Sequence, residues 1–133
     1  MQKAILALLL TLSLTVSAAQ STNLSPSTYN SLNDIQTLMG EEKYAEASEE
    51  LQELTEDLKP GFGLALAYQL YGQLALTQDN ASGAINWFRK SLALDALTDQ
   101  QTINLSTTVA QLLLADEQYQ KAIDELQPRY TRA

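Results

Sequence analysis

Between Pro26 and Gln127, apolar residues recur every three or four positions, and no stretch shows a sustained alternation of apolar and polar residues. That spacing places apolar side chains on one face of an α-helix, whereas a half-buried strand needs a period of two. Glycine, proline and clustered polar residues interrupt the pattern at Gly40, 59–61, 79–83, 95–99, Asp116 and Pro128. The sequence therefore predicts an all-α fold with helices of roughly 11 to 17 residues, paired by short turns.

Two helix starts carry local signals. Ser25 followed by Pro26 has the pattern of an N-cap residue with proline in the first helical turn, where its missing N–H costs nothing. Thr98 with Gln101 three residues later forms a capping box. At the other end of the chain, we expect Pro128 to close the last helix.

The helix pairs follow one template. Alanines at 47, 84 and 122 are each followed four residues later by a large apolar residue, namely Leu51, Phe88 and Leu126. A small residue at the anchor position lets two helices approach closely, and the large residue one turn later fills the space against the following helix. A fixed period over three helix pairs is typical of a stacked solenoid.

These residues resemble the tetratricopeptide repeat. Residues 68–75 (YQLYGQLA) followed by 84–88 (AINWF) are similar to its W-x2-L-G-x2-Y and A-x3-F pattern. The resemblance covers residues 28–130, as repeats of about 28–61, 65–98 and 103–130, although the anchors lie 37 and 38 residues apart rather than 34. It implies a right-handed α-solenoid of three hairpins, in which the first helix of each pair lines a concave groove that binds a protein or peptide.

A narrower resemblance rests on four segments: 24–26 (LSP) with Tyr29, 63–67 (GLALA), 92–97 (LALDAL) and 109–112 (VAQL). Their order is similar to the start of periplasmic tetratricopeptide proteins encoded beside TonB–ExbB–ExbD energy-transduction systems of Gram-negative bacteria. Those relatives are longer. The resemblance implies a periplasmic partner in TonB-dependent outer-membrane transport and no catalytic role.

The first residues have the order of a secretory signal peptide. Lys3 precedes an apolar stretch at residues 4–16, and the small residues 17–19 follow it. The stretch is shorter than the roughly 20 residues that span a bilayer, so we expect cleavage after Ala19 and no stable membrane insertion afterwards; an uncleaved anchor is the alternative. Residues 1–19 are thus a predicted signal peptide and 20–27 a flexible lead-in, and the protein is expected to be periplasmic or secreted.

The composition excludes most enzyme classes. Without Cys or His, thiol nucleophiles, histidine acid–base catalysis and most transition-metal sites are impossible, so we expect no enzyme, no cofactor and no metal. The polar turn at 79–83 has a fragment of a calcium-loop pattern but lacks its distal glutamate, and helix capping explains it better. The net charge of −8 argues against nucleic acid and favours a neutral or basic partner.

Most of the residues predicted to bind a partner in the groove have amide side chains. Eleven residues before each anchor alanine stands a glutamine. The predicted partner-binding set combines these three glutamines with neighbouring amides, one hydroxyl and two leucines: Gln36, Gln69, Gln73, Asn104, Thr107, Gln111, Leu66 and Leu76. Amides both donate and accept hydrogen bonds, which suits the backbone of an extended peptide. The alternative is that glutamine occupies these positions only because it is a good surface helix former.

Three other features have a structural and a functional interpretation. The acidic residues at 41–57 are expected on the outer face of a helix, either for solubility or to dock a basic segment. Trp87 is expected at a repeat boundary or on the outer face, where it either packs or binds a partner. After Pro128 no further helix follows, so Leu112, Ile123, Leu126 and Tyr130 are expected to form an apolar end that self-associates or is covered by a further repeat.

Overall fold

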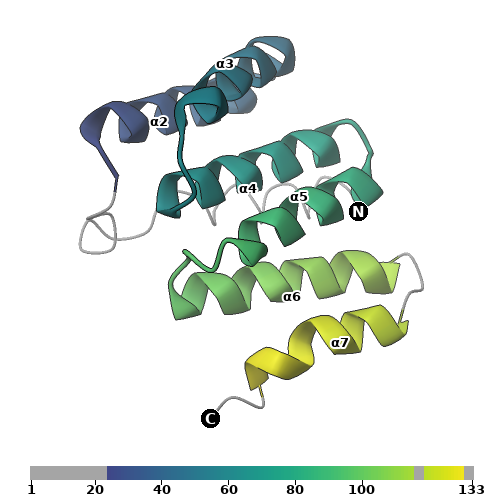
Figure 1. The fold of residues 1–133 in the computed structure, drawn as a ribbon. Helices are drawn as coiled ribbons and strands as arrows, with labels where there is room; N and C mark the ends of the chain where they lie inside the picture. Colours follow the sequence, from purple (N-terminus) through teal and green to yellow (C-terminus); the bar gives the residue numbers. More distant parts are fainter. Residues whose placement is uncertain (1–23, 116–118, 131–133) are drawn as a thin grey trace.

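In a computed structural model, residues 24–115 and 119–130 are described, and they contain helices and turns but no strand. The helices are α2 (Pro26–Gly40), α3 (Tyr44–Asp57), α4 (Phe62–Thr77), α5 (Ala81–Ala93), α6 (Asp99–Ala115) and α7 (Tyr119–Tyr130). Each even-numbered helix lies antiparallel to the next odd-numbered one, which gives the hairpins α2/α3, α4/α5 and α6/α7 (Figure 1). The all-α prediction is confirmed for this part of the chain.

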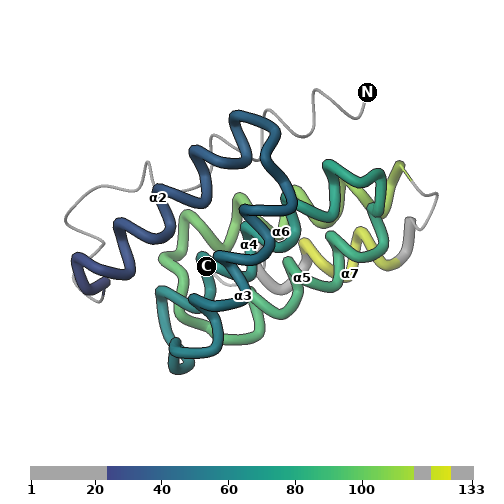
Figure 2. Tube along the Cα trace, turned by 90° about the horizontal axis from the view of Figure 1, so that it is seen from above, coloured from purple at the N-terminus to yellow at the C-terminus, as the bar shows by residue number. Residues whose placement is uncertain are grey.

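The hairpins follow one another in chain order. α4 packs against both helices of the preceding hairpin, and α5 packs against α6 of the next one. Seen from above, α3, α5 and α7 gather on one side and α2, α4 and α6 on the other (Figure 2). Most tertiary contacts therefore join neighbouring helices, as expected when each hairpin covers the apolar side of the one before it.

Local signals fix the helix starts. The Ser25 side chain accepts a hydrogen bond from the Thr28 amide at 3.1 Å, with Pro26 in the first turn. At the start of α6, the backbone N–H of Gln101 donates to Thr98 Oγ1 at 3.2 Å, and the backbone N–H of Thr98 donates to the side-chain oxygen Gln101 Oε1 at 2.9 Å. Both predicted caps are confirmed, and each pairs amides that would otherwise lack a partner inside the helix.

The template positions form the core. The anchor alanines Ala47, Ala84 and Ala122 are 0%, 0% and 3% exposed, and Leu51 and Phe88 are completely buried. Gly72 shows why this core needs small residues: a Cβ there would lie 2.2 Å from Cε1 of Phe88. The α4/α5 hairpin therefore has a close contact in which the backbone of Gly72 packs directly against the ring of Phe88.

The last helix corrects the prediction made from Pro128. α7 continues through Pro128 to Tyr130, so this proline does not close the helix. A proline removes one backbone donor, and its ring clashes with the carbonyl one turn earlier. At the end of a helix this disturbance affects a single turn, which explains why two further residues keep helical geometry.

Three predictions fall partly or wholly on other residues. The predicted signal peptide, residues 20–23 of the lead-in and the predicted break at Asp116 lie outside the described residues. Pro26 and Ser27, which the prediction assigned to a flexible lead-in, belong to α2. Within residues 24–115 and 119–130, no helix is long and apolar enough to cross a membrane.

Candidate partner-binding site

The predicted groove residues of the middle hairpin are buried. Leu66, Gln69, Gln73 and Leu76 on α4 expose only 3%, 4%, 1% and 5% of their surface. α4 contacts α2, α3 and α5, and twelve of its residues are buried. A helix that is apolar nearly all round is an interior helix. These four side chains offer almost no surface to a partner in this conformation, and their part in binding stays a prediction.

The accessible members of the set lie on α6. Gln111 is exposed, and Asn104 and Thr107 are half-buried. Gln100, which the sequence prediction left out, is also exposed and lies one turn before Asn104. Residues spaced by three and four share one helix face. We call Gln100, Asn104, Thr107 and Gln111 the α6 polar stripe.

Hydrogen bonds made by the stripe residues determine which donors and acceptors remain for a ligand. Gln100 Nε2 donates to Asn104 Oδ1 at 2.9 Å, which holds the Asn104 amide in one orientation. Thr107 Oγ1 donates to the Ile103 carbonyl at 2.8 Å, so its remaining capacity is as an acceptor. Together the side chains present both donors and acceptors along one face of α6. The four-residue spacing between Gln100 and Asn104 could have revealed this extension from the sequence.

Gln36 is the member of the predicted partner-binding set that lies on the first hairpin. It is half-buried on α2, and α2 packs on α4. Of the three aligned glutamines, Gln36 and Gln111 thus have accessible surface, whereas Gln73 between them has almost none. The three glutamines occupy equivalent positions in the sequence alignment, but they do not form a continuous row on the surface.

The charge of the even-numbered helices limits what they can bind. α2, α4 and α6 contain no Lys or Arg. A carboxylate ligand is held best by Lys or Arg, and these three helices offer neither. A ligand on this side of the molecule would have to be recognised through amides, hydroxyls and apolar side chains.

An aromatic cluster joins the first two hairpins. The Trp87 ring stacks on Tyr71 with centroids 4.2 Å apart and planes inclined by 12°, and Tyr68 lies 5.6 Å away. The Tyr71 hydroxyl is 3.5 Å from Thr55 Oγ1 on α3. Lys90 Nζ lies 4.5 Å from the centroid of the Trp87 ring, on which it forms a cation–π contact. Trp87 thus packs on side chains of α4 and α5, within its own hairpin, and Tyr71 connects the cluster to α3. Its placement at a repeat boundary stays a prediction.

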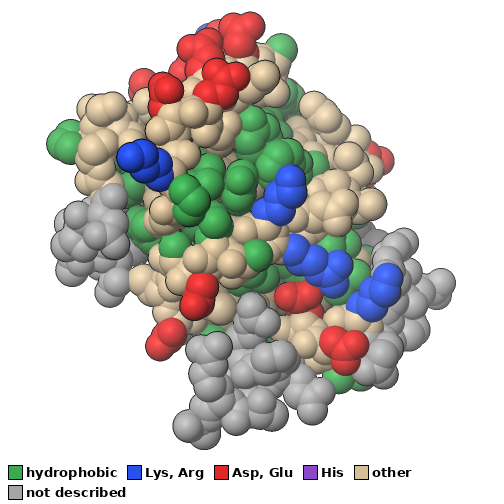
Figure 3. All heavy atoms as spheres, viewed as in Figure 1, with side chains coloured by type: hydrophobic (Ala, Val, Ile, Leu, Met, Phe, Trp, Pro, Cys, Tyr) green, Lys and Arg blue, Asp and Glu red, His purple; other side chains and the backbone are tan. Residues whose placement is uncertain are grey.

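The acidic residues of α3 lie opposite its core face. Ala47 and Leu51 are buried and Tyr44, Leu54 and Leu58 are partly buried, whereas the carboxylates at 46, 49, 50, 53, 56 and 57 are all exposed. Figure 3 shows these acidic side chains gathered over α3, while cationic side chains lie over α5 and α7. The predicted division of α3 into an apolar and an acidic face is confirmed.

The C-terminal hairpin exposes less apolar surface than expected. Ile123 is 54% exposed, but Leu112 is only 3% exposed, and Leu126 packs against the core. Leu112 is therefore a core residue and contributes no patch. Leu114 on α6 adds an exposed apolar side chain that was not predicted at this end. The side chain of Tyr130 lies outside the described part of the chain.

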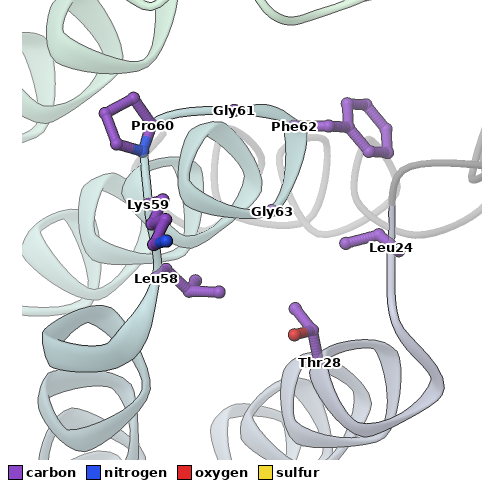
Figure 4. A pocket seen from close by; sticks show the side chains of 8 residues that line it. All are labelled: Leu24, Thr28, Leu58, Lys59, Pro60, Gly61, Phe62 and Gly63. Atoms are coloured by element: carbon purple, nitrogen blue, oxygen red, sulfur yellow. The ribbon is translucent and has the colours of Figure 1, made fainter.

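A hollow beside the start of α2 is a packing feature and not a candidate binding site. It has a volume of about 440 Å³ and is lined by Leu24, Thr28 and residues 58–63 (Figure 4). Its lining is mixed, with apolar side chains from Leu24 and Leu58 and a charged one from Lys59. The Thr28 hydroxyl already accepts a hydrogen bond from Ser25 at 2.9 Å. It is a packing seam between α2 and the α3–α4 connection.

The polar turn before α5 is a helix cap. Asn80 Oδ1 accepts a hydrogen bond from the Gly83 amide at 2.9 Å, and Asp79 adopts a left-handed conformation with φ 61°. Among the described residues, no acidic, histidine or cysteine side chains are grouped so that they could hold a metal ion. The capping interpretation of this turn is confirmed.

The sequence and the structure were also compared with known proteins. No family model, no curated protein and no solved structure matches this chain.

Proposed function

We propose that the protein is a three-repeat, tetratricopeptide-like right-handed solenoid that binds a peptide or an extended partner segment on the side formed by its even-numbered helices. The support for the repeat assignment is the equivalence of the buried anchors Ala47, Ala84 and Ala122, together with the close packing of Gly72 on Phe88. These are the positions at which the repeat pattern requires small and large residues.

The α6 polar stripe is the observation that carries the binding proposal. It combines exposed amides with no nearby cation on α2, α4 or α6, so it suits a peptide backbone better than a carboxylate or a phosphate. Gln36 on α2 extends the same side of the molecule. Apolar contact from the exposed Leu114 at the end of α6 would add affinity to these polar contacts.

Export is part of the same proposal. The order of charge, apolar stretch and small residues at 1–19 supports secretion to the periplasm. The specific role that we propose there is accessory to TonB-dependent transport. N-terminal sequencing of the accumulated protein tests this. We expect a chain that begins near Gln20, and retention of Met1 in a membrane fraction would contradict export with cleavage.

Site-specific photocrosslinking in the cell tests the binding site. A photoreactive residue at Gln111 should capture a defined protein other than this chain, whereas the same residue at Glu53 on the exposed face of α3 should capture no such protein. Both positions are exposed and lie on helices, so they differ mainly in the face that they sample. Capture of another protein from Glu53 and not from Gln111 would place the binding site on the acidic face.

The second candidate function is assembly. The exposed Ile123 and Leu114 near the end of the last described hairpin would suit stacking on a second copy or on a further repeat. Substitution of Ile123 by Glu distinguishes the two functions, because it should abolish assembly through this end and leave capture from Gln111 unchanged.

A further inference from the structure

The outer side of α5 carries a cationic hollow around the aromatic cluster. It has a volume of about 570 Å³ and is lined by Gly83, Asn86, Trp87, Arg89, Lys90 and Ala93. One face of the Trp87 ring is occupied by Tyr71, so the indole is held rigidly while it lines the hollow. Tryptophan, tyrosine and arginine are enriched among the residues that dominate protein interfaces, and this hollow combines a rigid tryptophan with an arginine.

The two cations in the hollow differ in how their charge is balanced. Arg89 Nε is 3.1 Å from Glu125 Oε1. Lys90 has no ion pair within residues 24–115 and 119–130 and instead lies over the indole ring. In a chain with net charge −8, this is a site where positive charge lacks a carboxylate partner.

The chain itself carries the complementary surface. Between Glu46 and Asp57, no carboxylate of α3 forms an ion pair within the described ranges. Glu46, Glu49, Glu53 and Glu56 are spaced by three and four, so they form one exposed stripe along the helix. The acidic side chains over α3 and the cationic ones over α5 are visible from the same side of the molecule (Figure 3).

We propose that the α5 hollow is a dimer interface that receives the acidic stripe of α3 from a second copy of this chain. A two-fold axis between two copies facing each other through this side brings each acidic stripe onto the other copy's hollow, so both contacts form at once. Trp87 provides apolar contact area at the centre of each contact, and Lys90 exchanges its contact with the indole for a carboxylate. This surface is separate from the α6 polar stripe, so the proposal stands independently of the proposed function.

Matched charge substitutions test the proposal. The protein is purified in the form that the cell accumulates, and its association is measured by sedimentation equilibrium up to the highest soluble concentration. The wild type should be a reversible dimer that weakens as salt is raised, because exposed charge pairs are screened. Lys90→Glu should weaken the dimer by about tenfold or more, since it places like charges in contact. Lys121→Glu makes the same charge change at an exposed position outside the hollow and should leave the dimer nearly unchanged.

A charge exchange separates this interface from others. Glu49→Lys/Glu53→Lys should weaken the dimer in the same way, but when it is mixed with Lys90→Glu the two variants should form a mixed dimer that is tighter than the dimer of either variant alone. Circular dichroism confirms that each variant is helical before association is measured. A wild type that stays monomeric, a dimer that is as tight in Lys90→Glu as in the wild type, or a dimer that is lost only on Ile123→Glu would each overturn the proposal.

Discussion

Replacement of Gly72 by alanine tests the close packing that defines the central hairpin. An added Cβ would lie 2.2, 2.5 and 2.7 Å from three atoms of the Phe88 ring, and Phe88 is completely buried. Inserting a methyl group into such a core costs about 1–3 kcal/mol, and a contact this short belongs at the upper end of that range. Alanine regains about 1 kcal/mol because glycine is a poor helix former. The net expectation is a loss of about 1–2 kcal/mol.

Urea denaturation followed by circular dichroism measures this loss as a lower midpoint with an unchanged slope. Gly40→Ala is the matched control, because nothing lies within 4 Å of a Cβ at this exposed position at the end of α2. It should leave stability unchanged or raise it slightly. The double substitution Gly72→Ala/Phe88→Leu should recover part of the loss. A Gly72→Ala variant as stable as the wild type would refute the proposed contact between α4 and α5.

Four further predictions concern stability, and all are measured by denaturant titration. Ala84→Leu should cost about 1–3 kcal/mol by overpacking, whereas Glu53→Gln on the exposed face should stay within about 0.5 kcal/mol; equal effects would mean that the faces are wrongly assigned. Asn80→Ala should cost about 1 kcal/mol because α5 loses its cap, and a neutral result would argue against that cap. Ser91→Ala should cost about 1 kcal/mol, because the buried Ser91 hydroxyl donates to the Ala65 carbonyl at 2.7 Å. Ser106→Ala should be neutral or stabilising, because its buried hydroxyl has no hydrogen-bond partner among the described residues.

Interactions within a few residues could be predicted from the sequence. The caps at Ser25 and Thr98 depend on spacings of three residues, and the structure has both. The core positions of α3 followed from helical periodicity, because one face of that helix is strongly charged and the other is not. In each of these cases, the residues that decide the structure are close together in the sequence.

Burial at the candidate site could not be predicted by aligning the repeats. The alignment treats Gln36, Gln73 and Gln111 as equivalent, but α4 is the central helix and packs against α2, α3 and α5. The signal was present in α4 itself, where Gln69 and Gln73 are rare polar residues in a helix that is otherwise almost entirely apolar. Such a helix is interior, and its polar residues are buried with it. The predicted place of Leu112 in a C-terminal apolar patch is wrong for a similar reason, because Leu112 is buried in a core shared by α4, α5, α6 and α7.

The central claim is that a partner segment binds through the α6 polar stripe. The most direct measurement is a calorimetric titration of the segment captured from Gln111 against the wild type and against Asn104→Ala/Gln111→Ala. We predict that the double variant keeps its helicity and binds more than tenfold more weakly, while Gln52→Ala on the exposed side of α3 has no effect. Binding that the double variant retains, and that high salt abolishes, would contradict the claim and place the contact on the acidic face.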